Sequence, residues 1–212
     1  MRTSRKSKIR VQVVFVLFLM VVAAAVIAGI RAKYRSNVEM SETVKFQADL
    51  AESVTLAEHA VSRNDDGTYS LSKVIAEGGT NSYQVMPGVD IPKDPTFTIT
   101  GKSNIEAYLY VEIVEEVKSA AGFTQGNIPE TVEYTLTDQW EKLDVTGQNG
   151  GDVYVYNGTL STPDGIQILE NNLLVVSQEY SEFTDEFRLV FYGYMAQQID
   201  GLSAAAVYNE VF

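Results

Sequence analysis

The sequence predicts a mainly β protein: one antiparallel β-sandwich over residues 36–212, with one or two short helices, behind an apolar helix in residues 1–35. Hydrophobic residues after position 43 recur with a period of two rather than 3.6. The apolar stretches are short and regularly spaced, and turns containing Gly and Asn separate them, as in sandwich folds. No repeat or Pro/Gly linker divides residues 36–212, which indicates a single domain.

The first 35 residues have the layout of an export signal or membrane anchor. Five basic residues precede Val11–Ile30, a run of 20 residues that Gln12 alone interrupts. A basic segment followed by an apolar one is typical of a signal peptide, and about 20 apolar residues suffice to cross a bilayer. Ala28, with Val26 two positions earlier, forms an acceptable cleavage site. The cations that follow it suit a retained anchor, so both fates stay open.

Charge divides the chain in two. Of 16 Lys and Arg residues, 8 lie in the first 35 positions, where no acid occurs, and the remainder carries 8 basic and 28 acidic residues, a formal charge of −20. Such a domain lacks the clustered cations that neutralise phosphates, so we expect no nucleic-acid partner. The chain has no cysteine, which excludes disulfides and thiol chemistry. We predict an extracellular or cell-surface domain, membrane-anchored if the leader is retained.

Alternation and turn residues place the strands in order. The first expected strand is Val44–Leu50, and residues 54–72 read as a hairpin around the turn Asn64-Asp65-Asp66-Gly67. Met86-Pro87-Gly88 fits a type II turn. The remaining strands are expected at Thr96–Thr100, Ile105–Ile113, Tyr134–Leu136, Trp140–Val145, Val153–Tyr156, Leu173–Ser177 and Phe187–Gln197.

Two of these strands carry specific expectations. Ile105–Ile113 places Ala107, Leu109 and Val111 on a buried face and a more polar set on a solvated face. Phe187–Gln197 is apolar on both faces and should be central. Ser203 is a suitable N-cap for a short helix through Phe212, and Val114–Ala121 is a weaker helix candidate.

Three stretches of the chain share features with one group of exported proteins. They are the leader running into Phe46-Gln47-Ala48-Asp49-Leu50-Ala51-Glu52, the segment Val85-Met86-Pro87-Gly88-Val89-Asp90-Ile91-Pro92-Lys93-Asp94-Pro95 with Ala107-Tyr108-Leu109-Tyr110-Val111, and Phe191-Tyr192-Gly193-Tyr194-Met195-Ala196-Gln197-Gln198-Ile199-Asp200-Gly201-Leu202. Together they resemble the TasA and camelysin-like proteins of Gram-positive bacteria. The cations after the apolar run depart from that pattern.

The resemblance implies a fold, a processing enzyme and an activity. It implies a jelly-roll-like sandwich, export through a SipW-type signal peptidase, and assembly with other copies or other matrix proteins into biofilm fibres. In such fibres an N-terminal segment of one subunit completes the sheet of the next, because an open sheet edge offers unpaired backbone groups. Val38–Ala48 is the donor candidate here. It equally reads as the first strand of its own domain.

Candidate catalytic and metal-binding residues are few. His59 is the single histidine, and no His-Glu-x-x-His motif exists, although camelysin-like proteins are described as metalloproteases. Zinc hydrolases typically use two or three histidines, so we read His59 as a surface strand residue. Asn64–Gly67 lacks the ligand spacing of an EF-hand. Asp90 and Asp94 flank a Pro-containing turn and have the residue type to share an ion. We assign no catalytic, cofactor-binding or metal-binding residue and expect no cofactor.

Aromatic residues and one sequon give weaker functional signals. Trp140 could stack on a sugar, but packing in or beside the core is the commoner role of a lone Trp in a strand. The tyrosine pairs 108/110, 154/156 and 192/194 suit cross-strand packing, or else a subunit or ligand surface. Asn157-Gly158-Thr159 matches a glycosylation acceptor and also a simple turn.

Three functions are therefore compatible with the sequence. The first is a non-enzymatic surface or matrix protein that assembles. The second is a camelysin-type exported metalloendopeptidase, for which loss of chelator-sensitive cleavage in His59→Ala would be the specific sign. The third is a membrane-tethered adhesive or ligand-binding module.

Charge makes a prediction about any assembly. The acidic domain carries −20, or −17 if cleavage after Ala28 leaves three cations attached, and self-repulsion at such a charge opposes association in low salt. We expect light scattering to report faster assembly with added salt, acid pH or divalent cations. If none of these three conditions changes the assembly rate, the difference in charge between the basic leader and the acidic domain matters only for export.

Overall fold

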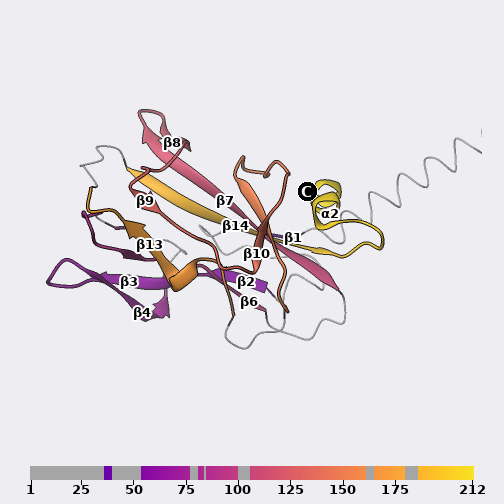
Figure 1. Cartoon of the computed structure of the whole chain (residues 1–212), viewed down its shortest axis with the longest axis horizontal. Helices are drawn as coiled ribbons and strands as arrows, with labels where there is room; N and C mark the ends of the chain where they lie inside the picture. Colours follow the sequence, from indigo (N-terminus) through magenta and orange to yellow (C-terminus); the bar gives the residue numbers. More distant parts are fainter. Residues whose placement is uncertain are drawn as a thin grey trace, which may run out of the picture.

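The computed structural model describes residues 36–39, 54–76, 81–83, 85–99, 106–160, 165–179 and 186–212. The described part is mainly β, with antiparallel sheets and one α-helix (Figure 1). The expected strand Val44–Leu50 and the apolar run Val11–Ile30 lie outside it. No helix within the described residues is long and apolar enough to cross a membrane.

The largest sheet is built on two long strands, β7 (Ala107–Ser119) and β14 (Phe187–Gln197). They pair antiparallel over eleven residues, from Phe187 opposite Val117 to Gln197 opposite Ala107. Three strands extend the sheet in the order β1-β14-β7-β11-β10, and β8 (Gly122–Gln125) pairs with the far end of β7. The added strands are β1 (Ser36–Glu39), β11 (Asp152–Tyr156) and β10 (Trp140–Lys142).

Three smaller sheets complete the fold. One has the order β12-β6-β2, formed by Ile166–Gln167, Thr96–Ile99 and Val54–Ala57. Another has the order β5-β13-β9, formed by Ile91–Pro92, Leu173–Val176 and Val132–Glu133, with a 3₁₀ turn at Glu170–Asn172 before β13. The third is the hairpin of β3 (His59–Arg63) and β4 (Tyr69–Ile75).

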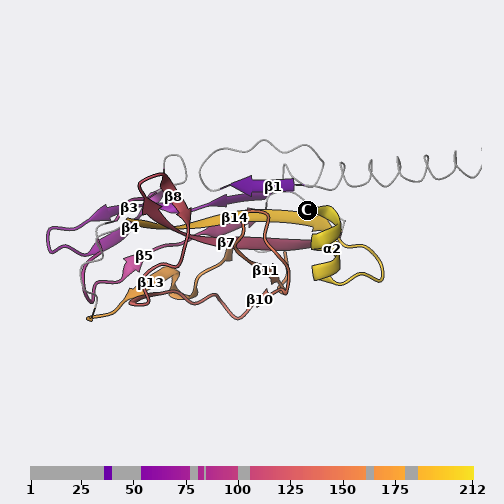
Figure 2. The same cartoon turned by 90° about the horizontal axis from the view of Figure 1, so that it is seen from above.

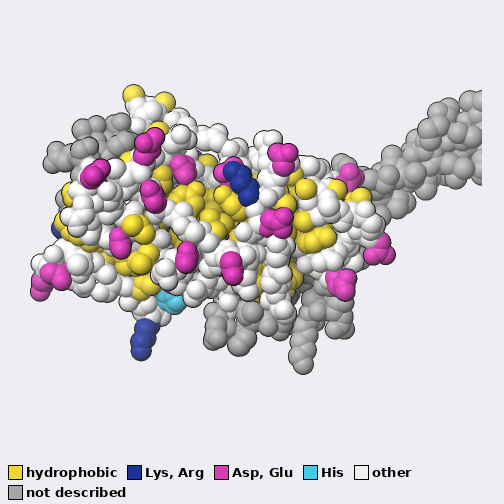
Figure 3. Space-filling view, viewed as in Figure 1, with side chains coloured by type: hydrophobic (Ala, Val, Ile, Leu, Met, Phe, Trp, Pro, Cys, Tyr) yellow, Lys and Arg dark blue, Asp and Glu magenta, His cyan; other side chains and the backbone are white. Residues whose placement is uncertain are grey.

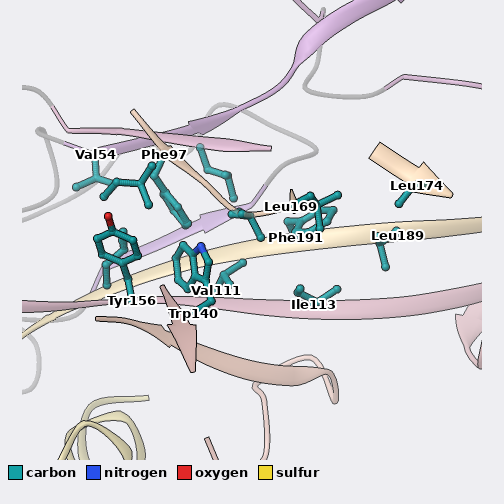
Figure 4. Packing of buried hydrophobic residues seen from close by; sticks show 14 of the residues in the cluster. Val54, Phe97, Val111, Ile113, Trp140, Tyr156, Leu169, Leu174, Leu189 and Phe191 are labelled. Atoms are coloured by element: carbon teal, nitrogen blue, oxygen red, sulfur yellow. The ribbon is translucent and has the colours of Figure 1, made fainter. Parts of the chain in front are cut away.

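One core fills the space between the main sheet and the smaller sheets. Phe97 from β6, Trp140 from β10 and Phe191 from β14 point into it (Figure 4). The Trp140 ring lies 5.9 Å from that of Phe97 and 5.2 Å from that of Tyr156, and its indole N–H donates to the Gln167 carbonyl at 2.9 Å. Trp140 is therefore a core residue, and stacking of a sugar on its buried ring is excluded.

A second core occupies the opposite face of β7 and β14. Helix α2 (Ala204–Val211) packs Val207, Tyr208 and Val211 there, and Ser203 caps it by accepting from the Ala206 N–H, as expected. The prediction that the even-numbered face of β7 is solvated is wrong, because α2 and its neighbours cover it: Tyr110 and Glu112 are fully buried. The predicted helix at Val114–Ala121 is also wrong, since β7 continues to Ser119 and is followed by a turn.

The remaining expectations concern turns and strand limits. The turn after Asn64 is confirmed, with the Gly67 N–H donating to the Asn64 carbonyl at 3.0 Å, and so is the turn at Met86. The hairpin spans β3 and β4, whereas β2 pairs instead with β6. The strands at 153–156, 173–177 and 187–197 are confirmed, and those at 134–136 and 140–145 are shorter or shifted.

Candidate functional site

Four charged or titratable side chains gather where β2 meets β3, and we call them the His59 cluster: Glu58, His59, Lys93 and Asp94. Glu58 occupies the single residue between the two strands, and Lys93 and Asp94 lie between Pro92 and Pro95. The two prolines hold this segment extended, and the Lys93 N–H donates to the Asn172 carbonyl. Residues 35 positions apart are thereby brought together.

Asp94 holds His59 through both carboxylate oxygens. Oδ1 accepts from the His59 backbone N–H at 2.9 Å, and Oδ2 lies 2.6 Å from His59 Nδ1. The Asp94 side chain is 7% exposed, whereas the His59 side chain is 42% exposed. A buried carboxylate in contact with Nδ1 fixes the orientation of the imidazole ring and leaves Nε2 as the nitrogen that can meet another group. Histidines in metal sites and histidines that act as general bases are oriented in the same way.

The second pair of the cluster is buried on both sides. Lys93 Nζ lies 2.9 Å from Glu58 Oε2, with side-chain exposures of 9% and 1%. The Lys93 ammonium also lies 5.4 Å from the centroid of the Phe191 ring, within the range of a cation–π interaction. Burial, followed by the charges of Glu58 and Asp94, raises the pKa of the nearby Tyr83, whose hydroxyl donates to the Pro92 carbonyl.

The cluster does not supply a set of metal ligands. Within the described ranges, no three His, Cys, Asp or Glu side chains are placed to hold a metal ion. Asp90 and Asp94 make separate contacts, since Asp90 accepts from the Val176 N–H while Asp94 is engaged by His59. In the Asn64–Gly67 turn, hydrogen bonds from Thr68 occupy Asp66 and lower the pKa of its carboxyl. The geometry supports a polar link between β3 and the 93–95 segment, with one imidazole half exposed.

Glu112 forms a second buried polar centre beneath α2. Its carboxylate accepts from the backbone N–H groups of Asn149 and Gly151 at 2.7 and 2.9 Å, from Asn149 Nδ2 at 3.0 Å and from the Tyr194 hydroxyl at 2.6 Å. A Cβ at Gly147 would collide with this carboxylate. Glu112 thus folds the 147–151 loop onto the sheet, and the alternating pattern of β7 had placed it in solvent.

The edge of the main sheet next to β14 is the third candidate. β1 pairs with residues 192–195 of β14, placing Val38 opposite Gly193. Within the described residues no strand pairs with residues 188–191 on this side, so β1 covers only part of the edge (Figure 2). Of the predicted donor Val38–Ala48, Val38 and Glu39 belong to β1 and the others lie outside the described residues.

The remaining sequence signals have local structural partners. The tyrosines at 110, 156 and 194 are buried, and Tyr154 packs against the main core. Asn157 is exposed, but its side-chain amide donates to Glu141 Oε2 at 2.8 Å and its backbone N–H donates to the Gln139 carbonyl. Neither the buried Lys93–Glu58 pair nor the Glu112 network is visible in the sequence, beyond the two prolines around Lys93-Asp94.

The Lys93–Glu58 pair predicts a clear pattern of stabilities. Lys93→Met alone leaves Glu58 buried without its cation and should lower the free energy of unfolding by about 3–5 kcal/mol. Glu58→Leu/Lys93→Met removes both charges and should regain most of that loss. Urea denaturation measures both, with Lys142→Met in the exposed Lys142–Asp152 pair as control, expected within about 1 kcal/mol of wild type. A double variant as unstable as the single one would contradict a desolvated pair.

The buried tyrosines predict a loss of stability in alkali. Burial, followed by the Glu112 charge, raises the pKa of Tyr208 from 10.0 to about 12, and burial also raises the pKa of Tyr110 and Tyr194. Between pH 10 and 12 the unfolded chain loses phenol protons that the native chain keeps, so stability falls as pH rises. Tyr208 alone should contribute up to about 1.4 kcal/mol per pH unit there.

Denaturation at several pH values, together with absorbance of the phenolate, measures this effect. Tyr208→Phe should make the free energy of unfolding depend less on pH between pH 10 and 12. The substitution should change the stability at pH 7 less than the stability in that interval. A stability that is constant up to pH 12 would contradict the burial of these rings.

Comparison with known proteins adds no relative. No family model, curated protein or solved structure matches the chain. The likeness to TasA and camelysin-like proteins therefore rests on the sequence motifs alone and stays a prediction.

Proposed function

We propose that the chain is an exported cell-surface or biofilm-matrix structural protein, built as a jelly-roll-like sandwich, whose copies assemble by strand addition. The observation that carries this is the β14 edge, on which β1 forms a four-residue antiparallel pair, and no other strand of the described residues pairs with this edge. An open edge of a sheet is a template for a strand from another chain.

Exchange of β1 between copies is the physical route. The backbone hydrogen bonds between β1 and residues 192–195 of β14 can form equally well when β1 comes from a neighbouring copy. Residues 40–53 connect β1 to β2, so the strand is joined to the domain through a single connection of 14 residues. A donated segment that continues beyond β1 in the same antiparallel register would reach residues 188–191 of β14.

The rest of the chain is consistent with export. The basic leader and the run Val11–Ile30 have the layout that export requires, and the domain behind them is acidic and free of cysteine. Acidic side chains are spread over the domain surface, as Figure 3 shows for one face. A SipW-type signal peptidase would release the domain, and a retained leader would anchor it to the membrane.

Proline substitution in β1 tests strand addition. Asn37→Pro/Val38→Pro removes two successive backbone N–H groups. Because alternate residues of β1 direct their N–H groups toward β14, one of these two groups must belong to the hydrogen-bond ladder with β14. Sedimentation velocity should then show monomers under conditions in which the wild-type domain assembles. Asn37→Ala/Val38→Ala keeps both N–H groups and should assemble nearly as the wild type does.

A peptide of residues 36–48 provides the complementary test. It should occupy the edge of β14 and stop growth when present in excess, whereas a scrambled peptide should not. Assembly of the proline variant at the wild-type rate, with no inhibition by the peptide, would overturn strand addition.

A further inference from the structure

Exposed apolar side chains gather at two separate places. Of the large hydrophobic side chains exposed in the described residues, Leu71, Val74 and Ile75 lie on β4, with Val74 at 69% exposure. Ile199 and Leu202, at 38% and 39%, flank the turn before α2. The β3–β4 hairpin lies at one end of the described domain and α2 with its preceding turn lies at the other, in both Figure 1 and Figure 2. Two different neighbours can therefore occupy the two places at once.

The two places carry opposite charge. We call Leu71, Lys73, Val74 and Ile75 the β4 patch. Strands β3 and β4 themselves contain no acidic residue, and the two acids of the hairpin, Asp65 and Asp66, lie in the turn between them. Lys93, Lys118, Lys142 and Arg188 each meet a carboxylate, whereas no ion pair is shown for Lys73 within the described residues. The exposed Lys73 is thus available to a carboxylate of another molecule.

The second place has the complementary charge. We call Ile199, Asp200 and Leu202 the α2-turn patch. Asp200 is exposed between the two apolar side chains, and no Lys or Arg follows Arg188 in the chain. The apolar residues at the two places offer a contact area, and the lysine and the aspartate offer an ion pair across it.

Local hydrogen bonds fix both patches before any contact. In β4, the Ser72 hydroxyl accepts from the Val74 N–H and donates to the Val74 carbonyl, both at 3.0 Å, where the pairing with β3 is irregular. In the α2-turn patch, the Leu202 N–H donates to the Ile199 carbonyl at 3.0 Å, and Gly201 takes the positive φ that the turn requires. Ordered surfaces lose less entropy on binding than mobile ones.

We propose that the β4 patch of one copy binds the α2-turn patch of the next. Such a contact joins two different surfaces, so it is heterologous and continues from copy to copy instead of closing a symmetric dimer. Each patch has only three or four residues, far fewer than the 20–30 of a standard interface. The contact is therefore weak alone and acts as a second link in the assembly proposed above, on which its biological role rests.

Charge exchange tests this contact apart from strand addition. The measurement is sedimentation equilibrium at up to millimolar concentration, with Asn37→Pro/Val38→Pro in every chain so that strand addition is removed. In this background, Lys73→Glu and Asp200→Lys should each weaken association about tenfold, because each places like charges together. An equimolar mixture of the two variants should restore association. The acidic side chain introduced at position 73 of one variant then faces the basic side chain introduced at position 200 of the other.

Two controls separate the contact from general effects of charge and hydrophobicity. Lys142→Glu makes the same charge change at a lysine outside both patches and should leave the association constant near that of the background. Val74→Ser should weaken association, whereas Val175→Ser, at a valine of 52% exposure on β13, should not.

The outcomes are decisive in both directions. Loss with either single variant and recovery in the mixture would support the contact even if β1 proves not to be donated. A background that stays monomeric at millimolar concentration, charge variants that associate as the background does, or a mixture that fails to recover would each overturn it.

Discussion

The pairing of β7 with β14 is the constraint on which the rest of the structure depends. Eleven consecutive residue pairs join the two strands, and both faces of the ladder are covered. On one face the main core contains Phe97, Trp140 and Phe191, and on the other Tyr110 and Tyr194 pack against Tyr208 of α2. Apolar side chains cover both faces of this pair, so separating β7 from β14 costs much free energy and the two strands stay paired as long as the protein is folded. Strand β1, in contrast, contacts the pair only at the edge of β14.

Buried charge connects the peripheral parts to the β7–β14 pair. Lys93 joins Glu58 and lies over the Phe191 ring of β14, so the start of the hairpin is tied to the central ladder. Glu112 of β7 accepts four hydrogen bonds and holds the 147–151 loop beneath α2. These acids are satisfied inside the domain, whereas Asp200 and many others remain on a surface whose repulsion any assembly has to overcome.

The sequence predicts the long strands well because their patterns are local. Phe187–Gln197 is apolar on both faces, and the structure places it under cover on both faces, as expected. Ser203 likewise identifies the start of α2. The solvated face expected for β7 was wrong because Glu112 and its neighbours look polar in isolation. The 147–151 loop and Tyr194 cover Glu112, and α2, about 95 residues later in the chain, covers Tyr110.

The candidate sites were less predictable for the same reason. His59 and Asp94 are each visible in the sequence, but their contact spans 35 positions and depends on how β2 continues into β3. No local pattern in the sequence shows that Lys93 is buried against Glu58. No sequence motif marks the β4 patch or the α2-turn patch, because the exposure of Val74 and Ile199 depends on which elements pack against them in the fold.

Native-state hydrogen exchange of the monomeric domain tests most directly whether β1 can detach while β7 and β14 stay paired. The amides of β7 that pair with β14 should exchange only by global unfolding, and those of Asn37–Glu39 should exchange at least about a hundredfold faster, by local opening of β1. Protection of β1 equal to that of the β7–β14 ladder would mean that β1 cannot leave its own domain without unfolding it, and would contradict the account.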